Sequence, residues 1–181
     1  KIFGNLIGVN FFGAGINLTH LYQGRIPYLW YLLRDLGYVN KLYRGLALPD
    51  ASPEEDSVEK LWVAAVEGFA IGGHCQILLA VDLTLAEDGA YLTLPARKEG
   101  IVPGAANLRL PRFVGDRIAR QAVMAERRIE CASREGRLIC DAIVRPEEMD
   151  AAIERTVASL TGSGVVSAAS NRRAFRTAQE P

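Results

Sequence analysis

Two apolar runs separated by paired glycines stand at the centre of the chain. Residues 61–66 form an uninterrupted apolar run of strand length, and residues 75–81 form a second, largely apolar run. Between them, Gly72 and Gly73 favour a sharp turn, so the pattern predicts a buried strand, a turn and the start of a helix. Backbone N–H groups at a helix start lack intrahelical partners and attract negative charge. The glycines are equally consistent with a turn that serves only tight packing.

A similar arrangement opens the chain. Residues 2–12 are mostly apolar and predict a strand, and a second glycine turn follows at residues 13–18. Residues 18–23 predict a short helical turn. Residues 27–46 predict an amphipathic helix, because apolar side chains recur there at steps of three and four and a proline stands at the start. Its aromatic residues fit either core packing or the lining of a pocket: Tyr28, Trp30, Tyr31, Tyr38 and Tyr43.

The remaining chain alternates between strand and helix patterns. The acidic, proline-containing segment 48–57 predicts a surface loop, and a loop rich in proline and glycine over residues 95–110 leads into a helix. We expect strands at 82–86, 90–94 and within 138–144, and helices at 116–124, 133–139 and 146–160. This alternation is typical of α/β proteins.

The chain has 181 residues, which is enough for one domain with a core. We expect the core to span residues 1–160 and a C-terminal helical segment to begin within residues 161–181. Lys1 leads directly into an apolar run, and the basic segment 171–181 shows no apolar pattern with which to pack. We therefore expect the chain to be a piece of a longer enzyme, truncated at both ends.

Composition excludes several classes of partner. Hydrophobic residues make up 49% and charged residues 23% of the chain, and the net charge is zero. No basic excess indicates nucleic acid or an anionic membrane, and no apolar span or signal peptide is evident. Cys75, Cys131 and Cys140 are scattered, which argues against a disulfide framework and indicates a reducing cytoplasm. His20 and His74 have no metal-binding spacing, so we expect no metal site.

Three motifs carry a resemblance to a known family. They are F-x-A-G-I-N at residues 12–17, V-E-G-F-A-I-G-G at residues 66–73 and G-I-V-P-G-A-A-N-L-R-L at residues 100–110. In this order and spacing they resemble the crotonase, or enoyl-CoA hydratase/isomerase, superfamily. The resemblance implies a spiral of ββα units, an acyl-CoA thioester substrate, and a homotrimer or hexamer. It also implies an oxyanion hole formed by the backbone N–H groups of Ile16 and Gly73.

The residues that hydratases of this family use are replaced. A thioester carbonyl gains negative charge when its α carbon becomes an enolate, and two N–H donors stabilise that charge. Typical hydratases add two glutamates, at the positions held here by Gln76 and Ala96. Glutamine is no carboxylate base and alanine transfers no proton. Glu99 follows closely, and either substitutes for them or is structural.

This departure is similar to one branch of the family. Its members are dioxygenases of dihydroxyphenylglycine biosynthesis, which act on an arylacetyl-CoA with neither metal nor flavin. Carbanion formation, reduction of dioxygen as co-substrate, and release of CoA and an α-keto acid are what the resemblance implies. Two other classes stay open: a hydratase, isomerase or thioester hydrolase that uses Glu99 or His74, and a non-catalytic acyl-CoA binder.

Further site residues follow from the resemblance. Gln76 is expected to orient an oxygen atom or the thioester. Arg34 resembles a substrate-proximal arginine of that branch, although a salt bridge with Asp35 fits as well. His74 stands where glycine is usual, and either adds bulk beside the thioester, acts as an acid or base, or points away. The other predicted substrate contacts are Ile71, Ile101 and Val102, which form a dioxygen pocket or plain core, and Pro103, Gly104 and Asn107 beneath the acyl group, where an N-cap is the simpler role for Asn107.

Overall fold

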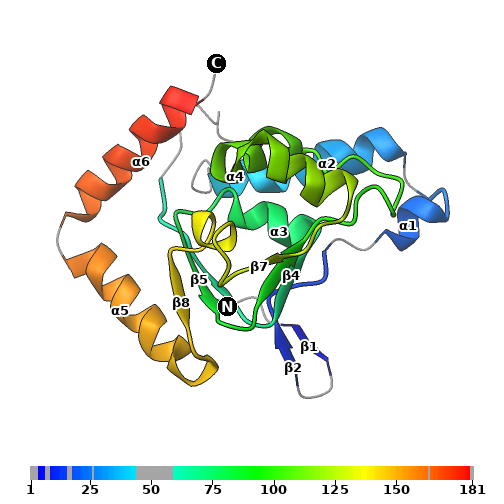
Figure 1. Cartoon of the computed structure of the whole chain (residues 1–181). Helices are drawn as coiled ribbons and strands as arrows, with labels where there is room; N and C mark the ends of the chain where they lie inside the picture. Colours follow the sequence, from blue (N-terminus) through cyan, green and yellow to red (C-terminus); the bar gives the residue numbers. More distant parts are fainter. Residues whose placement is uncertain are drawn as a thin grey trace.

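The computed structural model describes residues 4–6, 9–15, 18–25, 27–43, 59–162 and 164–179 (Figure 1). The loop predicted at 48–57 and the last residues of the helix predicted at 27–46 lie outside the described residues.

The first strands form a hairpin. β1 (Gly4–Leu6) pairs antiparallel with β2 (Val9–Phe11) in a two-stranded sheet. The single strand predicted for residues 2–12 was therefore wrong. Gly8 divides the apolar run in the sequence, and glycine is a common signal for a turn between two strands.

Two three-stranded sheets form the centre of the fold. One sheet is parallel, with β5 (Leu83–Glu87) between β3 (Val63–Val66) and β8 (Ala142–Val144). In the other sheet, β6 (Tyr91–Thr93) pairs parallel with β4 (Phe69–Ile71) and antiparallel with β7 (Ile129–Glu130). Consecutive strands such as β3 and β4 thus enter different sheets, and α3 (Gly73–Leu78) follows them. This is the predicted ββα arrangement.

The helices agree with the predicted pattern in most places. α1 (Thr19–Tyr22), α2 (Tyr28–Tyr43) and α5 (Met149–Gly162), which follows the 3₁₀ turn η2 (Pro146–Glu148), lie where helices were expected. α4 (Ala105–Met124) begins well before the predicted residue 116, and its two halves meet at a kink where Gly115 has φ 78° and ψ 156°. The helix predicted at 133–139 was also wrong, since only the 3₁₀ turn η1 (Gly136–Leu138) forms there.

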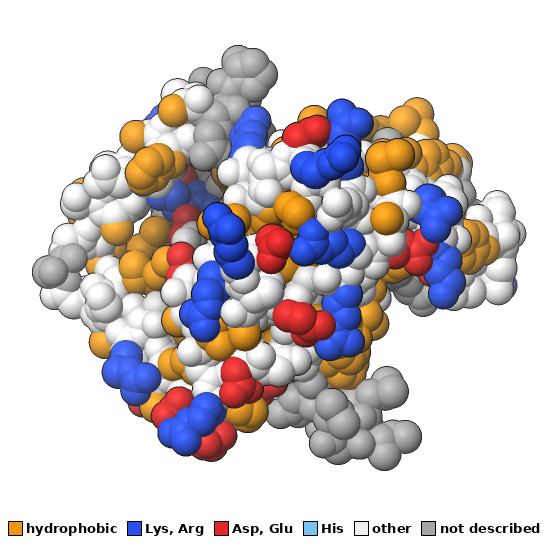
Figure 2. Space-filling model, viewed as in Figure 1, with side chains coloured by type: hydrophobic (Ala, Val, Ile, Leu, Met, Phe, Trp, Pro, Cys, Tyr) orange, Lys and Arg blue, Asp and Glu red, His pale blue; other side chains and the backbone are white. Residues whose placement is uncertain are grey.

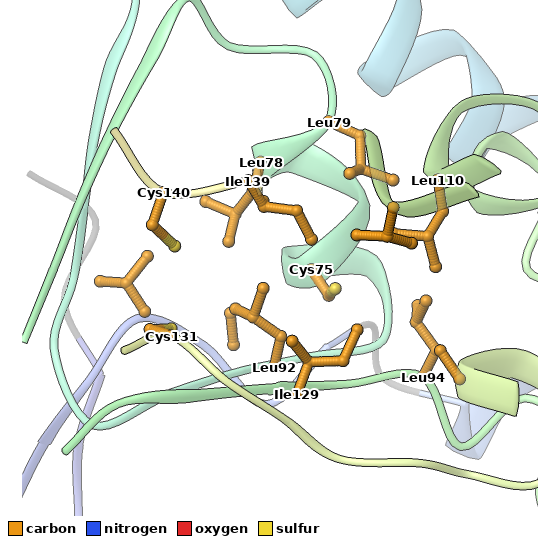
Figure 3. Close-up of a cluster of buried hydrophobic side chains, with 14 of the residues drawn as sticks. Cys75, Leu78, Leu79, Leu92, Leu94, Leu110, Ile129, Cys131, Ile139 and Cys140 are labelled. Atoms are coloured by element: carbon orange, nitrogen blue, oxygen red, sulfur yellow. The ribbon is translucent and has the colours of Figure 1, made fainter. Parts of the chain in front are cut away.

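The main core lies between α3, α4 and the β4–β6–β7 sheet (Figure 3). Leu78, Leu92 and Leu110 are almost completely buried there. Cys131 and Cys140 are buried in the same cluster as free thiols. This packing fixes α3 at the end of β4, which is where the first residues of α3 carry unpaired N–H groups.

The C-terminal helix packs through charge. α6 (Val165–Gln179) carries Arg172, whose Nη1 lies 2.6 Å from Glu59 Oε2 and whose Nε lies 2.7 Å from Asp82 Oδ1. Arg176 Nη2 lies 2.8 Å from Glu59 Oε1. Glu59 and both arginines are buried. The expectation that residues 171–181 have no core to pack on was therefore wrong, because their contacts with the core are ionic and leave no apolar pattern.

We predict that Arg172→Met destabilises the fold by about 3–5 kcal/mol, because it removes the arginine partner of the partly buried Asp82 and one of the two arginines that pair with the buried Glu59. Urea unfolding measures this change. The matched control is Arg173→Met, since Arg173 is exposed on the same helix and should change the free energy of unfolding by less than about 0.5 kcal/mol. Equal unfolding midpoints for the two variants would contradict the role of the buried pairs.

Candidate active site

The two predicted glycine turns lie against each other. The Ile71 N–H donates to Gly13 O at 2.9 Å, and Gly13 forms a parallel bridge with Ala70 of β4. A methyl group added to Gly15 would lie 3.0 Å from Ile71 O and 3.6 Å from Gly73 N. The first turn therefore runs beside β4 and meets the start of α3, in a contact too close for most side chains.

The second turn needs glycine for its backbone conformation. Gly72 has φ 57° and ψ −119°, and its N–H donates to Thr93 O at 3.0 Å. Gly15 also has positive φ, at 96°. Gly73 is the first residue of α3, where a backbone N–H has no intrahelical acceptor. The predicted second donor, Ile16, lies outside the described residues.

A cavity of about 340 Å³ lies beside these turns. Gly15, Gly72 and Gly73 line one part of it. The predicted site residues on its walls are Ile71, Gly73, Gln76, Ile101, Val102 and Pro103. His74, Gly104 and Asn107 are not part of this lining. Arg34 lies in α2, but its side chain is outside what the structure describes.

Gln76 joins the cavity to the start of α4. Its side chain is 3% exposed, and Oε1 accepts the Ala106 N–H at 3.1 Å. Because the oxygen is the acceptor in this bond, the amide NH₂ is the group that remains to donate toward the cavity. The N-cap of α4 is Gly104, with φ 56°, and Asn107 is exposed within the helix. The N-cap role predicted for Asn107 was therefore wrong.

Ala96 and Glu99 both line the cavity. Ala96 is buried and offers only a methyl group where a hydratase would have a carboxylate. The Tyr22 hydroxyl donates to Glu99 Oε2 at 2.7 Å and lies 2.9 Å from the Glu99 carbonyl oxygen. This hydrogen bond raises the pKa of Tyr22, because ionised Tyr22 would lose it and face a carboxylate.

Tyr28 is a second tyrosine at this edge. Its hydroxyl accepts the Val102 N–H at 3.0 Å, so α1 and α2 both hold the loop that forms one wall of the cavity. Sequence reasoning did not single out Tyr22, and it gave Tyr28 no partner. Both contacts join residues more than seventy positions apart, and the short polar helix α1 offers no periodic signal.

His74 reaches across to the first turn. Its Nδ1 accepts the Gly15 N–H at 3.1 Å, and the Phe12 ring meets the imidazole edge-on, with centroids 5.8 Å apart. Partial burial lowers the pKa of His74 from its usual value of 6.5. An accepting Nδ1 requires the tautomer with its proton on Nε2.

Within the part of the chain that the structure describes, no group of three or more His, Cys, Asp or Glu side chains is placed to hold a metal ion. No described helix is both long and apolar enough to cross a membrane.

The profile of the enoyl-CoA hydratase/isomerase family matches residues 50–180. The chain belongs to this family. The match begins before β3 and extends past the end of α6, so it includes the second glycine turn and the cavity wall from Gln76 to Pro103. The resemblance inferred from the three motifs is confirmed.

Two curated relatives illustrate the range of the family. The chain is 49% identical over 175 residues to (3,5-dihydroxyphenyl)acetyl-CoA 1,2-dioxygenase of Amycolatopsis orientalis, which covers 96% of this chain and 39% of that protein. It is 32% identical to carnitinyl-CoA dehydratase of Escherichia coli strain K12, over 96% of this chain and 62% of that protein. The chain thus spans less than two thirds of either relative.

Solved structures agree on the fold. Pseudomonas aeruginosa DspI matches with a TM-score of 0.75 and 22% identity, over 93% of this chain and 60% of that one. An enoyl-CoA hydratase subunit from Geobacillus kaustophilus matches with a TM-score of 0.76 and 22% identity, over 94% and 62%. The predicted family fold is confirmed.

We predict that Gln76→Met lowers the free energy of unfolding by about 0.5–1.5 kcal/mol, because the buried Ala106 N–H loses the Gln76 acceptor at 3.1 Å and keeps only the carbonyl oxygen of Pro103 at 3.3 Å. Gln76→Glu keeps an acceptor and should cost less. Chemical denaturation of both variants measures the difference. Asn107→Ala is the control, since Asn107 is exposed one residue beyond Ala106. Equal stability of Gln76→Met and the control would show that the hydrogen bond contributes nothing.

Proposed function

We propose that the protein is a dioxygenase that acts on an arylacetyl-CoA thioester and uses dioxygen as co-substrate without a metal or flavin. The observation that carries the proposal is the cavity beside the glycine turns. The two glycine turns line it, and we infer that their backbone N–H groups stabilise a thioester oxyanion. Gln76 and Ala96, which also line it, stand where hydration would need carboxylates. The 49% identity to a dioxygenase of an arylacetyl-CoA supports the same assignment.

The first step is formation of an enolate. The thioester carbonyl would accept hydrogen bonds from the N–H groups of Gly73 and Ile16, and the aryl ring would spread the remaining charge. Donors fixed before the reaction cost no reorganisation when charge develops. The Gln76 amide NH₂ would donate to an oxygen atom in the cavity, either of the thioester or of reduced dioxygen, while Oε1 accepts the Ala106 N–H.

Oxidation then uses the substrate's own electrons. The carbanion transfers electrons to dioxygen and a peroxide forms at the α carbon. Attack of the peroxide on the thioester carbonyl releases CoA. Cleavage of the O–O bond, together with loss of the second α proton, gives the α-keto acid. All the electrons that dioxygen gains come from the α carbon, so arylacetyl-CoA and dioxygen give an aryl α-keto acid and CoA with no further reductant. The apolar side chains of Ile71, Ile101 and Val102 suit a molecule as apolar as dioxygen.

From the same family resemblance, we also propose that the protein is cytoplasmic and forms a homotrimer or hexamer. Because the chain spans 39% of the dioxygenase relative, the activity belongs to the complete protein.

A second candidate function rests on Glu99. Its carboxylate lies on the cavity wall, and an enoyl-CoA hydratase or dehydratase needs such a group as acid or base. Relatives named carnitinyl-CoA dehydratase fit this class. Anaerobic hydration of an enoyl-CoA that is lost in Glu99→Gln would favour this candidate over the dioxygenase.

The proposal is tested by dioxygen consumption with 3,5-dihydroxyphenylacetyl-CoA in the complete protein. An oxygen electrode and a thiol assay should show equal amounts of dioxygen consumed and CoA released, with the α-keto acid as product, in the presence of a chelator. Release of CoA without dioxygen uptake would identify a hydrolase instead. Tight binding of the thioester with no turnover of an acyl-CoA panel would identify a binder.

We predict that Gly73→Pro lowers kcat by roughly 10²–10³, because proline removes one oxyanion donor. Proline is tolerated at the first position of a helix, where that N–H makes no helical bond. Gly73→Ala is the control, since it adds a carbon atom and keeps the N–H. Steady-state kinetics separates the two, and an equal loss in both variants would mean that bulk, and not the donor, matters.

A further inference from the structure

We propose that His74 is a positioning residue that fixes the first glycine turn against the second and thereby sets the geometry of the oxyanion site. The proposal rests on the proposed function, because it concerns the same backbone N–H groups at the two glycine turns. His74 itself does not line the cavity, so it acts through Gly15 and not on the substrate.

The imidazole contacts Gly13 and Gly15 of the first turn and Phe12 just before it. The Phe12 ring meets it at an interplanar angle of 88°, and a methyl group added to Gly13 would overlap it. The Gly15 N–H then donates to Nδ1 at 3.1 Å. The side chain of the second residue of α3 therefore fills the space that the missing Gly13 side chain leaves, and ends on a backbone donor of the opposite turn.

The hydrogen bond between His74 and Gly15 adds to the backbone hydrogen bonds that hold the first glycine turn against β4. Backbone bonds hold Gly13, whose N–H donates to Phe69 O at 3.2 Å and whose oxygen accepts the Ile71 N–H. Gly15 lies two residues beyond that pairing, and His74 provides its hydrogen bond. The next N–H in the sequence is that of Ile16, the predicted oxyanion donor. His74 therefore supports the chain one residue before that predicted donor in the sequence.

The contact operates only while Nδ1 is unprotonated. A doubly protonated ring would direct an N–H toward the Gly15 N–H, with no acceptor between them. The ring contacts Phe12, Gly13 and Gly15, none of which titrates, and burial is the cause of its lowered pKa, with no charged group among the described residues contributing. Because the folded pKa of His74 is lowered, the unfolded chain takes up the proton first as pH falls. The stabilisation is therefore complete above pH 6.5 and is lost as pH decreases toward the folded pKa.

Two substitutions at His74 distinguish the effect of its hydrogen-bond acceptor from the effect of its ring volume. His74→Phe keeps a flat ring against Phe12 and removes the acceptor, whereas His74→Gln keeps an acceptor. Ile77→Val, on the same helix and outside the cavity lining, is the matched control. The experiment uses the complete protein and measures amide hydrogen exchange at Gly15 by NMR, kcat and KM with 3,5-dihydroxyphenylacetyl-CoA, and the pH dependence of kcat.

We expect His74→Phe to speed amide hydrogen exchange at Gly15 at least about tenfold. The backbone N–H of Gln76, which donates to the oxygen of the N-cap residue Gly72, should keep its protection. We expect kcat to fall by about 10- to 100-fold with KM nearly unchanged, because a small displacement of a catalytic donor acts mainly on the transition state. His74→Gln should recover most of both losses, and it should abolish the decrease of kcat that we expect in wild type as pH falls through the lowered folded pKa of His74.

The two proposals fail differently. If wild type turns over no acyl-CoA, the proposed function is wrong, and hydrogen exchange at Gly15 still tests the hydrogen bond between His74 and Gly15. Unchanged Gly15 exchange or an unchanged kcat in folded His74→Phe would overturn the role of His74. If His74→Phe does not fold, the ¹⁵N shifts of wild-type His74 decide: a protonated Nδ1 at neutral pH would refute the hydrogen bond on which the role depends.

Discussion

The site depends on the pairing of the first glycine turn with β4. The hydrogen bond from Ile71 to Gly13 places a segment from the start of the chain beside a strand more than fifty residues later, at the point where α3 begins. Gly15 then allows a close backbone approach to Ile71, and Gly72 adopts a positive φ that residues with side chains rarely adopt. The cavity, the backbone N–H groups of the glycine turns beside it and the role proposed for His74 all require this contact.

The sequence predicted the parts of the fold that carry local signals. Strand and helix periodicity located β3, β5 and α2, and the paired glycines located the turn before α3. Two elements were missed for a physical reason: β4 is apolar throughout and β7 has only two residues, so neither shows an alternating pattern, and both form because a neighbouring strand supplies their hydrogen bonds. The helix α4 was placed too late because Pro111 and Gly115 interrupt its pattern.

Side-chain partners were harder to predict than positions. Gln76 lines the cavity, but its hydrogen bond to Ala106 links two helices and leaves no trace in the sequence spacing. The buried partnership of Arg172 with Glu59 joins residues 113 positions apart. His74 was recognised as a departure from the family, whereas its direction depends on the backbone at Gly72. Such long-range polar contacts follow from the assembled fold and not from any local pattern.

The most direct test of the central claim is the ¹³C chemical shift of a bound thioester carbonyl. An arylacetyl-CoA labelled at that carbon would be added to the complete protein under anaerobic conditions, so that no oxidation follows. Two N–H donors aimed at the carbonyl oxygen should polarise it and move the resonance downfield from that of the free thioester. A bound thioester whose carbonyl shift equals that of the free molecule would contradict the assignment of the glycine turns as an oxyanion site.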